Sequence, residues 1–297
     1  MNEVVVGLIG LAALLLLFLT GIELGFAMAL VGFVGFSIIV SSQAAMNLLA
    51  KDIFDVFASY GFTVIPLFIL MGQIAFNAGI AKRLYNASYK FIGHIPGGMA
   101  MATVVGATAF KAICGSSPAT AATVASIAVP EMDRYGYDKR LSTGIVASVG
   151  TLGVLMPPSV TLVVFGIITG LSIGKLFLAG LIPGLMIASF FIFTIYGWCK
   201  INPSLGPHGE RSTWKERFLS LPEIGLVVFI FLMMILGLMK GFFTPTEAGS
   251  VGTGLVLLLS LVRRDLDLKA FIKSVAESLR TACMVLMLIA GSTVLGH

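Results

Sequence analysis

From Ile95 to Pro130 the chain reads IPGGMAMATVVGATAFKAICGSSPATAATVASIAVP, an apolar sequence interrupted by the polar segment GSSPAT. A second apolar segment is interrupted between Ser148 and Val160, where the chain reads SVGTLGVLMPPSV. Backbone that leaves the helix at membrane depth is tolerated only where it is buried in protein or lines a cavity. In secondary transporters, paired interruptions of this kind point to a binding site near the middle of the bilayer. The two breaks therefore predict a transporter subunit.

The composition is that of an all-α polytopic membrane protein. Of 297 residues, 58% are apolar and 11% are charged, against roughly 25% charged residues in soluble domains. The net charge of +5 lies in short loops, where it sets orientation in the bilayer, and it does not indicate a nucleic-acid partner. The three cysteines and three histidines are scattered and give neither a disulfide framework nor a metal-ligand spacing.

Several apolar runs approach the roughly 20 residues that cross a bilayer. The segment 95–130 differs, because its second arm, residues 119–130, is too short to span and its tip is polar. We expect a re-entrant helical hairpin there. The expected spans are residues 4–19, 24–40, 62–78, 141–169 (broken), 175–200, 222–240, 246–262 and 279–296.

The basic residues predict the orientation. With the N-terminus in the periplasm, the loops 79–94, 131–140, 201–221 and 263–280 are cytoplasmic and hold most of the Lys and Arg residues. The loops on the other side hold only Lys51, Lys175 and Lys240. This asymmetry follows the positive-inside rule and predicts a multi-pass membrane protein with its N-terminus outside; the resemblance described below implies that the membrane is the bacterial inner membrane. Trp198 and Trp214 are expected to be interface anchors.

A weak internal repeat is also present. Spans 24–40 and 62–78 are joined by an amphipathic link, and so are spans 246–262 and 279–296. The two links lie on opposite sides of the membrane, so the repeats are inverted, as in many alternating-access transporters. We expect a first repeat over residues 1–221 and the start of a second over 222–297. The second repeat stops at His297, where its own hairpin would begin, which favours a C-terminally truncated part of a longer permease.

The first break has the chemistry of an anion site. Ser116, Ser117 and Thr120 supply hydroxyls, and Gly115 allows a close turn. Pro118 and Ala119 begin a helix whose N-terminal amides carry partial positive charge and suit a carboxylate. Carbonyls at the end of the preceding arm suit a cation, which adds Gly115, Ser116 and Ser117 to a cation site.

The second break has the chemistry of a cation site. Gly150, Thr151 and Gly153 free the backbone, and Pro157 with its neighbour Pro158 removes amide donors. The nearby carbonyls and the hydroxyls of Thr151 and Ser159 are oxygen ligands of the kind that hard cations prefer. Unwound carbonyls and half-helix ends are a known way to hold Na⁺.

Other readings of these residues remain open. Small residues and hydroxyls such as those of GSSPAT are also common at ordinary helix contacts in membranes. Lys111 could contact the substrate, as intramembrane charges often do, or its stem could reach toward an aqueous cavity. Glu247 is expected to cap the helix that starts at Pro245, with Thr244 as the N-cap.

The residues resemble the large membrane subunit of tripartite ATP-independent periplasmic (TRAP) transporters. The resemblance covers essentially the whole chain. Its motifs, in this order, are Phe62–Gly72, Ile95–Gly98, Cys114–Thr123, Pro130–Met132, Gly150–Ser159 and Thr244–Ala248. The departure is at the end, because members of the family continue through a second hairpin and a second broken helix after the position of His297.

The resemblance implies a Na⁺-driven, elevator-type importer of small carboxylates with no other cofactor. It also implies two partners: a small four-helix membrane subunit, and a periplasmic binding protein that delivers the substrate. The family's first Na⁺ site carries over to Ser116, Ser117, residues 150–153 and the region of Pro157.

Three alternatives are weighed beside it. A single-component Na⁺/anion symporter of similar architecture would work without a binding protein. A non-transporting scaffold fragment is a second alternative. The third is an intramembrane enzyme with Ser116 or Ser117 as nucleophile, for which Lys111 would be the one candidate base.

Overall fold

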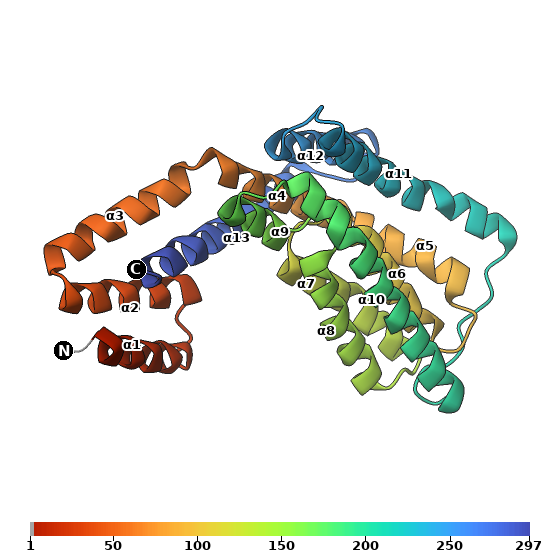
Figure 1. Ribbon diagram of the computed structural model, residues 1–297. Coiled ribbons are helices and arrows are strands. Elements are labelled where there is room, and N and C mark those ends of the chain that lie inside the picture. Colours follow the sequence, from red (N-terminus) through yellow and green to blue (C-terminus); the bar gives the residue numbers. More distant parts are fainter. Residues whose placement is uncertain (1–2) are drawn as a thin grey trace. The chain divides into compact units, whose positions relative to one another are not determined.

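The computed structural model describes residues 3–297, and all regular elements in that range are helices (Figure 1). In chain order the elements are α1 (Glu3–Phe18), α2 (Leu24–Ile39), α3 (Ser42–Ala58), the 3-10 turn η1 (Tyr60–Thr63), α4 (Val64–Asn77), α5 (Ile80–Ile92), α6 (Gly98–Lys111), α7 (Ser117–Arg134), α8 (Lys139–Leu155), α9 (Val160–Thr169), α10 (Ile173–Ile201), α11 (Trp214–Met239), α12 (Pro245–Val262) and α13 (Leu268–Leu295).

The helix lengths confirm a polytopic membrane protein. Six segments of the described chain are long and apolar enough to cross a bilayer, and α1 and α2 are shorter apolar helices. The six segments are Tyr60–Asn77, Lys139–Thr169, Ile173–Ile201, Trp214–Met239, Pro245–Val262 and Leu268–Leu295. Neither arm of the segment 95–130 is among them. At about 1.5 Å per residue, the 14 residues of α6 reach about 21 Å, short of a hydrocarbon core about 30 Å thick.

Helix α7 continues through Pro130 to Arg134, past the expected end of the second arm, α5 occupies the expected loop 79–94, and α11 and α13 begin earlier than the expected spans. Helix α11 begins at Trp214 instead of Pro222, because Thr213 and Glu216 form a capping box that starts the helix earlier. Helix α13 runs without interruption from Leu268 to Leu295, so the second amphipathic link is the first part of this helix and is not a separate element. The expected cap of α12 is confirmed: the Thr244 side chain accepts from the Glu247 amide, and the Glu247 carboxylate accepts from the Thr244 amide.

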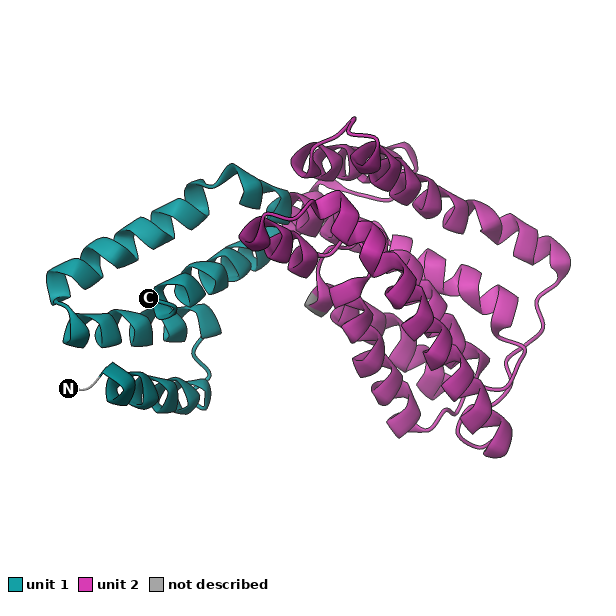
Figure 2. Ribbon diagram, in the orientation of Figure 1, with its two compact units in different colours: residues 1–66, 278–297 teal, residues 67–277 magenta. Residues whose placement is uncertain are grey.

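The chain divides into two compact units, and the division falls within α4 and within α13 (Figure 2). Unit 1 comprises residues 1–66 and 278–297, and unit 2 comprises residues 67–277. This division rests on contacts, whereas the expected boundary at 221/222 rests on sequence repeats and stays a prediction. Within unit 1, α2 and α13 cross closely at glycines: a Cβ on Gly25 would lie 2.7 Å from backbone atoms of Met287 and Leu288.

Unit 2 is organised around α6. Nearly every side chain of this helix is buried, including Met99, Met101 and Phe110. Small residues let neighbouring helices approach it, and a Cβ on Gly106 would lie 3.0 Å from the Cα of Tyr85 in α5. Helices α5, α7, α8 and α10 contact α6 around its circumference, which makes the first arm of the hairpin the centre of the unit.

The loop between α10 and α11 is fastened to the base of the hairpin. The Gly97 amide donates to the Gly206 carbonyl at 3.1 Å, and the Gly209 amide donates to the Gly93 carbonyl at 2.9 Å. The Tyr137 hydroxyl donates to the Pro207 carbonyl at 2.9 Å. Burial raises the pKa of Tyr137 to about 12, so this hydroxyl keeps its proton and its donor role at neutral pH.

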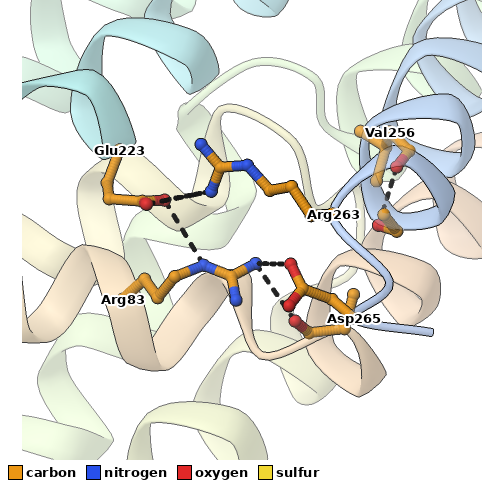
Figure 3. A network of polar contacts seen from close by, with 7 residues as sticks. Arg83, Glu223, Val256, Arg263 and Asp265 are labelled. Carbon is orange, nitrogen blue, oxygen red and sulfur yellow. Dashed lines mark hydrogen bonds and ion pairs between the residues drawn. The ribbon is translucent and has the colours of Figure 1, made fainter.

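Four charged side chains join α5, α11 and the turn after α12 (Figure 3). Arg83 pairs with Asp265 at 2.9 Å and with Glu223 at 3.3 Å, and Arg263 contacts both oxygens of Glu223 at 2.7 and 2.9 Å. Arg264 has a left-handed φ of 56°, and the Asp265 amide donates back to the Ser260 carbonyl. This helix-ending turn is what directs Asp265 toward Arg83. We refer to these four residues as the ion network.

Candidate functional site

The first break lies between Lys111, the last residue of α6, and Ser117, the first residue of α7. Ser116 is the N-cap of α7, and its side chain accepts from the Ala119 amide at 3.4 Å. Thr120 donates its hydroxyl to the Ser116 carbonyl at 2.8 Å. Ser116 and Thr120 are both buried. The hydroxyls of Ser116 and Thr120 are therefore held within the protein, which is what irregular backbone would need if it lay at membrane depth.

The second break lies between Leu155, the end of α8, and Val160, the start of α9. Ser159 is fully buried and donates its hydroxyl to the Val154 carbonyl at 2.7 Å. It makes no side-chain cap to α9. Pro157 is buried in the same turn, so this break is ordered by one backward hydrogen bond and by packing.

The two breaks lie against each other. The Val160 amide, at the start of α9, donates to the Gly115 carbonyl in the hairpin tip at 3.2 Å. Gly153 packs directly on Ser117, because a Cβ on Gly153 would lie 2.8 Å from the Ser117 Cα. One helical turn away, a Cβ on Gly150 would lie 3.1 Å from the Ala121 Cβ.

Helix α4 supports the tip from behind. A Cβ on Gly115 would lie 2.8 Å from the Cβ of Phe68, and a Cβ on Gly72 would lie 2.7 Å from the Cys114 sulfur. The Phe68 ring packs against Phe177 of α10 with 6.0 Å between ring centroids. Both rings are buried. Gly72 and Gly115 are therefore required for close approach of backbone segments, and the tip rests on a rigid aromatic base.

Lys111 is 1% exposed. Its ammonium makes no hydrogen bond within residues 3–297. A buried cation without a partner is costly, and intramembrane charges of this kind are functional candidates. The Lys111 ammonium is therefore free to bind a ligand, and the contacts of this side chain give it no structural role.

Most of the expected residues are brought together, and one lies apart from the buried cluster. Gly115, Ser116, Ser117, Ala119 and Thr120 form the first break, while Gly150, Gly153, Pro157 and Ser159 form the second. Thr151 is exposed, and its hydroxyl donates to the Ser148 carbonyl at 2.6 Å. The side chain of Pro118 is not among those that the structure describes.

The sequence reasoning missed two contributors: the Val160 amide, which connects the breaks, and Phe68, which supports the tip. The Val160 amide was foreseeable as the first amide of the helix after Ser159. Phe68 had no local signal, since it lies in an ordinary apolar run.

The arrangement brings the N-terminal ends of α7 and α9 and the C-terminal ends of α6 and α8 to one place. N-terminal ends favour anions and C-terminal ends favour cations. Half-helices that meet in this way inside a multi-pass helical protein define the class of secondary membrane transporters.

Comparison with known proteins agrees with this class. Residues 11–297 match the family described as the tripartite ATP-independent periplasmic transporter, DctM component. The chain belongs to this family, whose members are transporter components and not enzymes. It is a multi-pass protein of the bacterial inner membrane.

Individual relatives are similar over nearly all of the chain. A C4-dicarboxylate TRAP transporter large permease protein of Pseudomonas aeruginosa is 35% identical over 88% of this chain and 61% of its own length. A sialic acid TRAP transporter large permease protein of Vibrio cholerae is 31% identical over 94% of this chain and 65% of its own. An ectoine TRAP transporter large permease protein of Halomonas elongata is 33% identical over 95% and 66%, respectively. The chain thus spans about two thirds or less of the length of these relatives.

Proposed function

We propose that this chain forms part of the large permease subunit of a Na⁺-coupled secondary importer for small carboxylates. The observation that carries the proposal is the junction of the two breaks, where the Val160 amide meets the Gly115 carbonyl and Gly153 packs on Ser117. Membership of a family of transporter components supports it.

The proposed Na⁺ ligands are oxygen atoms around this junction. They come from the backbone and hydroxyls of Gly115, Ser116, Ser117, Gly150, Thr151, Gly153, Pro157 and Ser159. Hard cations favour such neutral oxygens where half-helix C-termini add negative potential. Ser159 and Thr151 already donate their hydroxyl protons to carbonyls, so the lone pairs of these oxygens are what remain for a cation.

The proposed substrate contacts lie on the hairpin side, in residues 116–120, where the N-terminal amides of α7 favour a carboxylate. Lys111 is the proposed cationic contact. Lys111→Met tests this, because the two side chains have similar volume. If Lys111 binds substrate, the Met variant folds but loses uptake. If uptake persists and the protein becomes more stable, as is common when a poorly paired buried charge is replaced by an apolar group, the assignment is wrong.

The proposed partners are a small four-helix membrane subunit and a periplasmic binding protein. One relative, of Oleidesulfovibrio alaskensis, carries the name isethionate TRAP transporter permease protein DctMQ and is 32% identical over 98% of this chain. The other names assign C4-dicarboxylate, sialic acid and ectoine to those relatives. We favour C4-dicarboxylates as the first substrates to test, because a C4-dicarboxylate relative has the highest identity of those described here.

Uptake measurements test the whole proposal. Proteoliposomes that contain the full-length permease and both partners should accumulate labelled C4-dicarboxylate only with an inward Na⁺ gradient. Uptake that ignores Na⁺ contradicts the coupling. Uptake that continues when the binding protein is left out favours a single-component symporter.

We also propose the inverted-repeat, elevator-type architecture with a re-entrant hairpin at 95–130 and the N-terminus in the periplasm. Arg134 in the expected cytoplasmic loop and Lys175 in the expected periplasmic one give the orientation test. Single cysteines are placed at these positions in a background without Cys114, Cys199 and Cys283. A membrane-impermeant thiol reagent on intact cells should label Lys175→Cys and should not label Arg134→Cys. Labelling of Arg134→Cys from outside would reverse the orientation.

A further inference from the structure

Unit 2 carries a groove of about 530 Å³ that is separate from the two breaks. Its lining comes mainly from α8 and α10, with Val104 from α6 and Leu205 from the loop after α10. Its lining is mostly aliphatic and aromatic: Val104, Leu141, Gly144, Ile145, Val149, Phe191, Ile195, Trp198 and Leu205, with Arg140, Ser148 and Thr194 as the polar members.

The lining suits a hydrocarbon chain better than a small carboxylate. Arg140 is the single charged residue in the wall. The Ser148 hydroxyl donates to the Gly144 carbonyl at 2.8 Å, so it has no proton left for a guest. A small anion in the body of the groove would lose its water without enough donors in return, whereas an acyl chain gains by leaving water.

One end of the groove is basic and lies where helices meet the membrane surface. Arg140 is the last residue of the charged run 131–140 and is in the first turn of α8, and Trp198 is in the last turn of α10 beside Lys200. Tryptophan and basic residues together are typical of the membrane–water boundary. The Asp138 carboxylate accepts from the Arg140 backbone amide at 2.7 Å, because Asp138 is the N-cap of α8. The Arg140 guanidinium forms no ion pair with the described part of the chain, and it lies exposed at the groove.

We propose that this groove binds an anionic phospholipid, with one acyl chain between α8 and α10 and the phosphate on Arg140. Charge complementarity selects the lipid class, since one basic residue close to a membrane surface favours an anionic over a zwitterionic headgroup by about fivefold. The apolar walls hold the chain without regard to the headgroup.

Trp198 provides the measurement, because it lines the groove and the chain has only two tryptophans. In a Trp214→Phe background, fluorescence from Trp198 is quenched when a brominated acyl chain occupies the groove. We expect brominated phosphatidylglycerol to reach half-maximal quenching at about one fifth of the mole fraction that brominated phosphatidylcholine needs. Arg140→Gln should remove this preference. Arg134→Gln should keep it, because Arg134 is an exposed basic residue at the end of α7 that does not line the groove.

A second pair of variants tests the apolar part. A Cβ on Gly144 meets nothing within 4 Å, so Gly144→Leu projects into the groove without disturbing the fold, and it should weaken quenching by both lipids. Gly225→Leu, at an equally open position on α11, should leave both unchanged. Equal quenching by the two lipids, or a preference that survives Arg140→Gln, overturns the phosphate contact. Quenching that Gly144→Leu does not weaken overturns the groove as the binding site and indicates a protein segment in its place.

Discussion

At the first break the serine caps the helix that follows it, and at the second break it does not. Ser116 accepts from the Ala119 amide of α7, whereas Ser159 donates backward to the Val154 carbonyl of α8. The start of α9 obtains its partner elsewhere, when the Val160 amide donates to Gly115 in the hairpin tip. The helix after the first break is therefore capped by a residue of the tip itself, while the helix after the second break takes a hydrogen-bond partner from the first break.

This difference explains why α8 needs a glycine where it contacts α7 and not along its whole length. Gly153 faces Ser117 with no room for a side chain, although Gly144 on the same helix faces open space. The second break can approach the tip only if the backbone of α8 lies directly on α7.

Replacement of Gly153 should have the largest effect. In Gly153→Ala the new methyl group meets the Ser117 backbone, which cannot rotate away, so we expect a loss of stability of about 3 kcal/mol, the upper part of the range for overpacking. Uptake should be lost as well. The matched variant Gly144→Ala should be neutral or stabilised by up to about 1 kcal/mol through helix propensity. Thermal unfolding in detergent distinguishes them, and equal melting temperatures would show that the breaks do not need this contact.

Removal of the Ser159 hydroxyl should come next. Ser159→Ala removes the hydrogen bond from a fully buried hydroxyl to the Val154 carbonyl, which we expect to cost about 1.5 kcal/mol. Ser159→Thr keeps the hydroxyl and should recover part of the loss. Hydrogen exchange at α9 is the measurement, since the second break should loosen while α7 keeps its protection. Loss of protection in α7 alone would mean that the first break depends on the second.

Removal of the first cap should have a smaller effect. Ser116→Ala deletes one N-cap acceptor, which typically costs about 1 kcal/mol. The exposed N-cap Ser41, which accepts from Ala44 at the start of α3, offers a control in another unit: Ser41→Ala should cost no more than Ser116→Ala. If Ser41→Ala lowers the melting temperature more than Ser116→Ala does, then burial does not make the Ser116 cap contribute more to stability than the exposed Ser41 cap.

Thr151 should have the smallest effect on stability. Its side chain is exposed and its hydroxyl bonds within its own helix, so Thr151→Val should change stability by less than about 0.5 kcal/mol. If Thr151 is a Na⁺ ligand, the Na⁺ concentration for half-maximal uptake should nevertheless rise. An unchanged Na⁺ dependence would remove Thr151 from the proposed site.

The sequence predicted the membrane class and the positions of both breaks, because length, apolar character and the Gly-Pro-Ser clusters are local properties. The Thr244–Glu247 cap was predictable for the same reason. Helix α11 begins before the expected span at Pro222, because the capping box at Thr213 starts the helix earlier. The contacts of Gly115 with Phe68 and Val160 depend on packing between distant segments, which no local pattern encodes.

The ion network also bears on the order in which the protein is made. Arg83 leaves the ribosome long before Glu223 and Asp265, so the first turn of α5 is made before its acidic partners exist. Glu223 of α11 is the first partner of Arg83, and the four charges sum to zero only after Arg263 and Asp265 have followed. A nascent chain that ends at Val262 would therefore already contain the whole hairpin and the Arg83–Glu223 pair between α5 and α11, while the turn that carries Asp265 would still be missing.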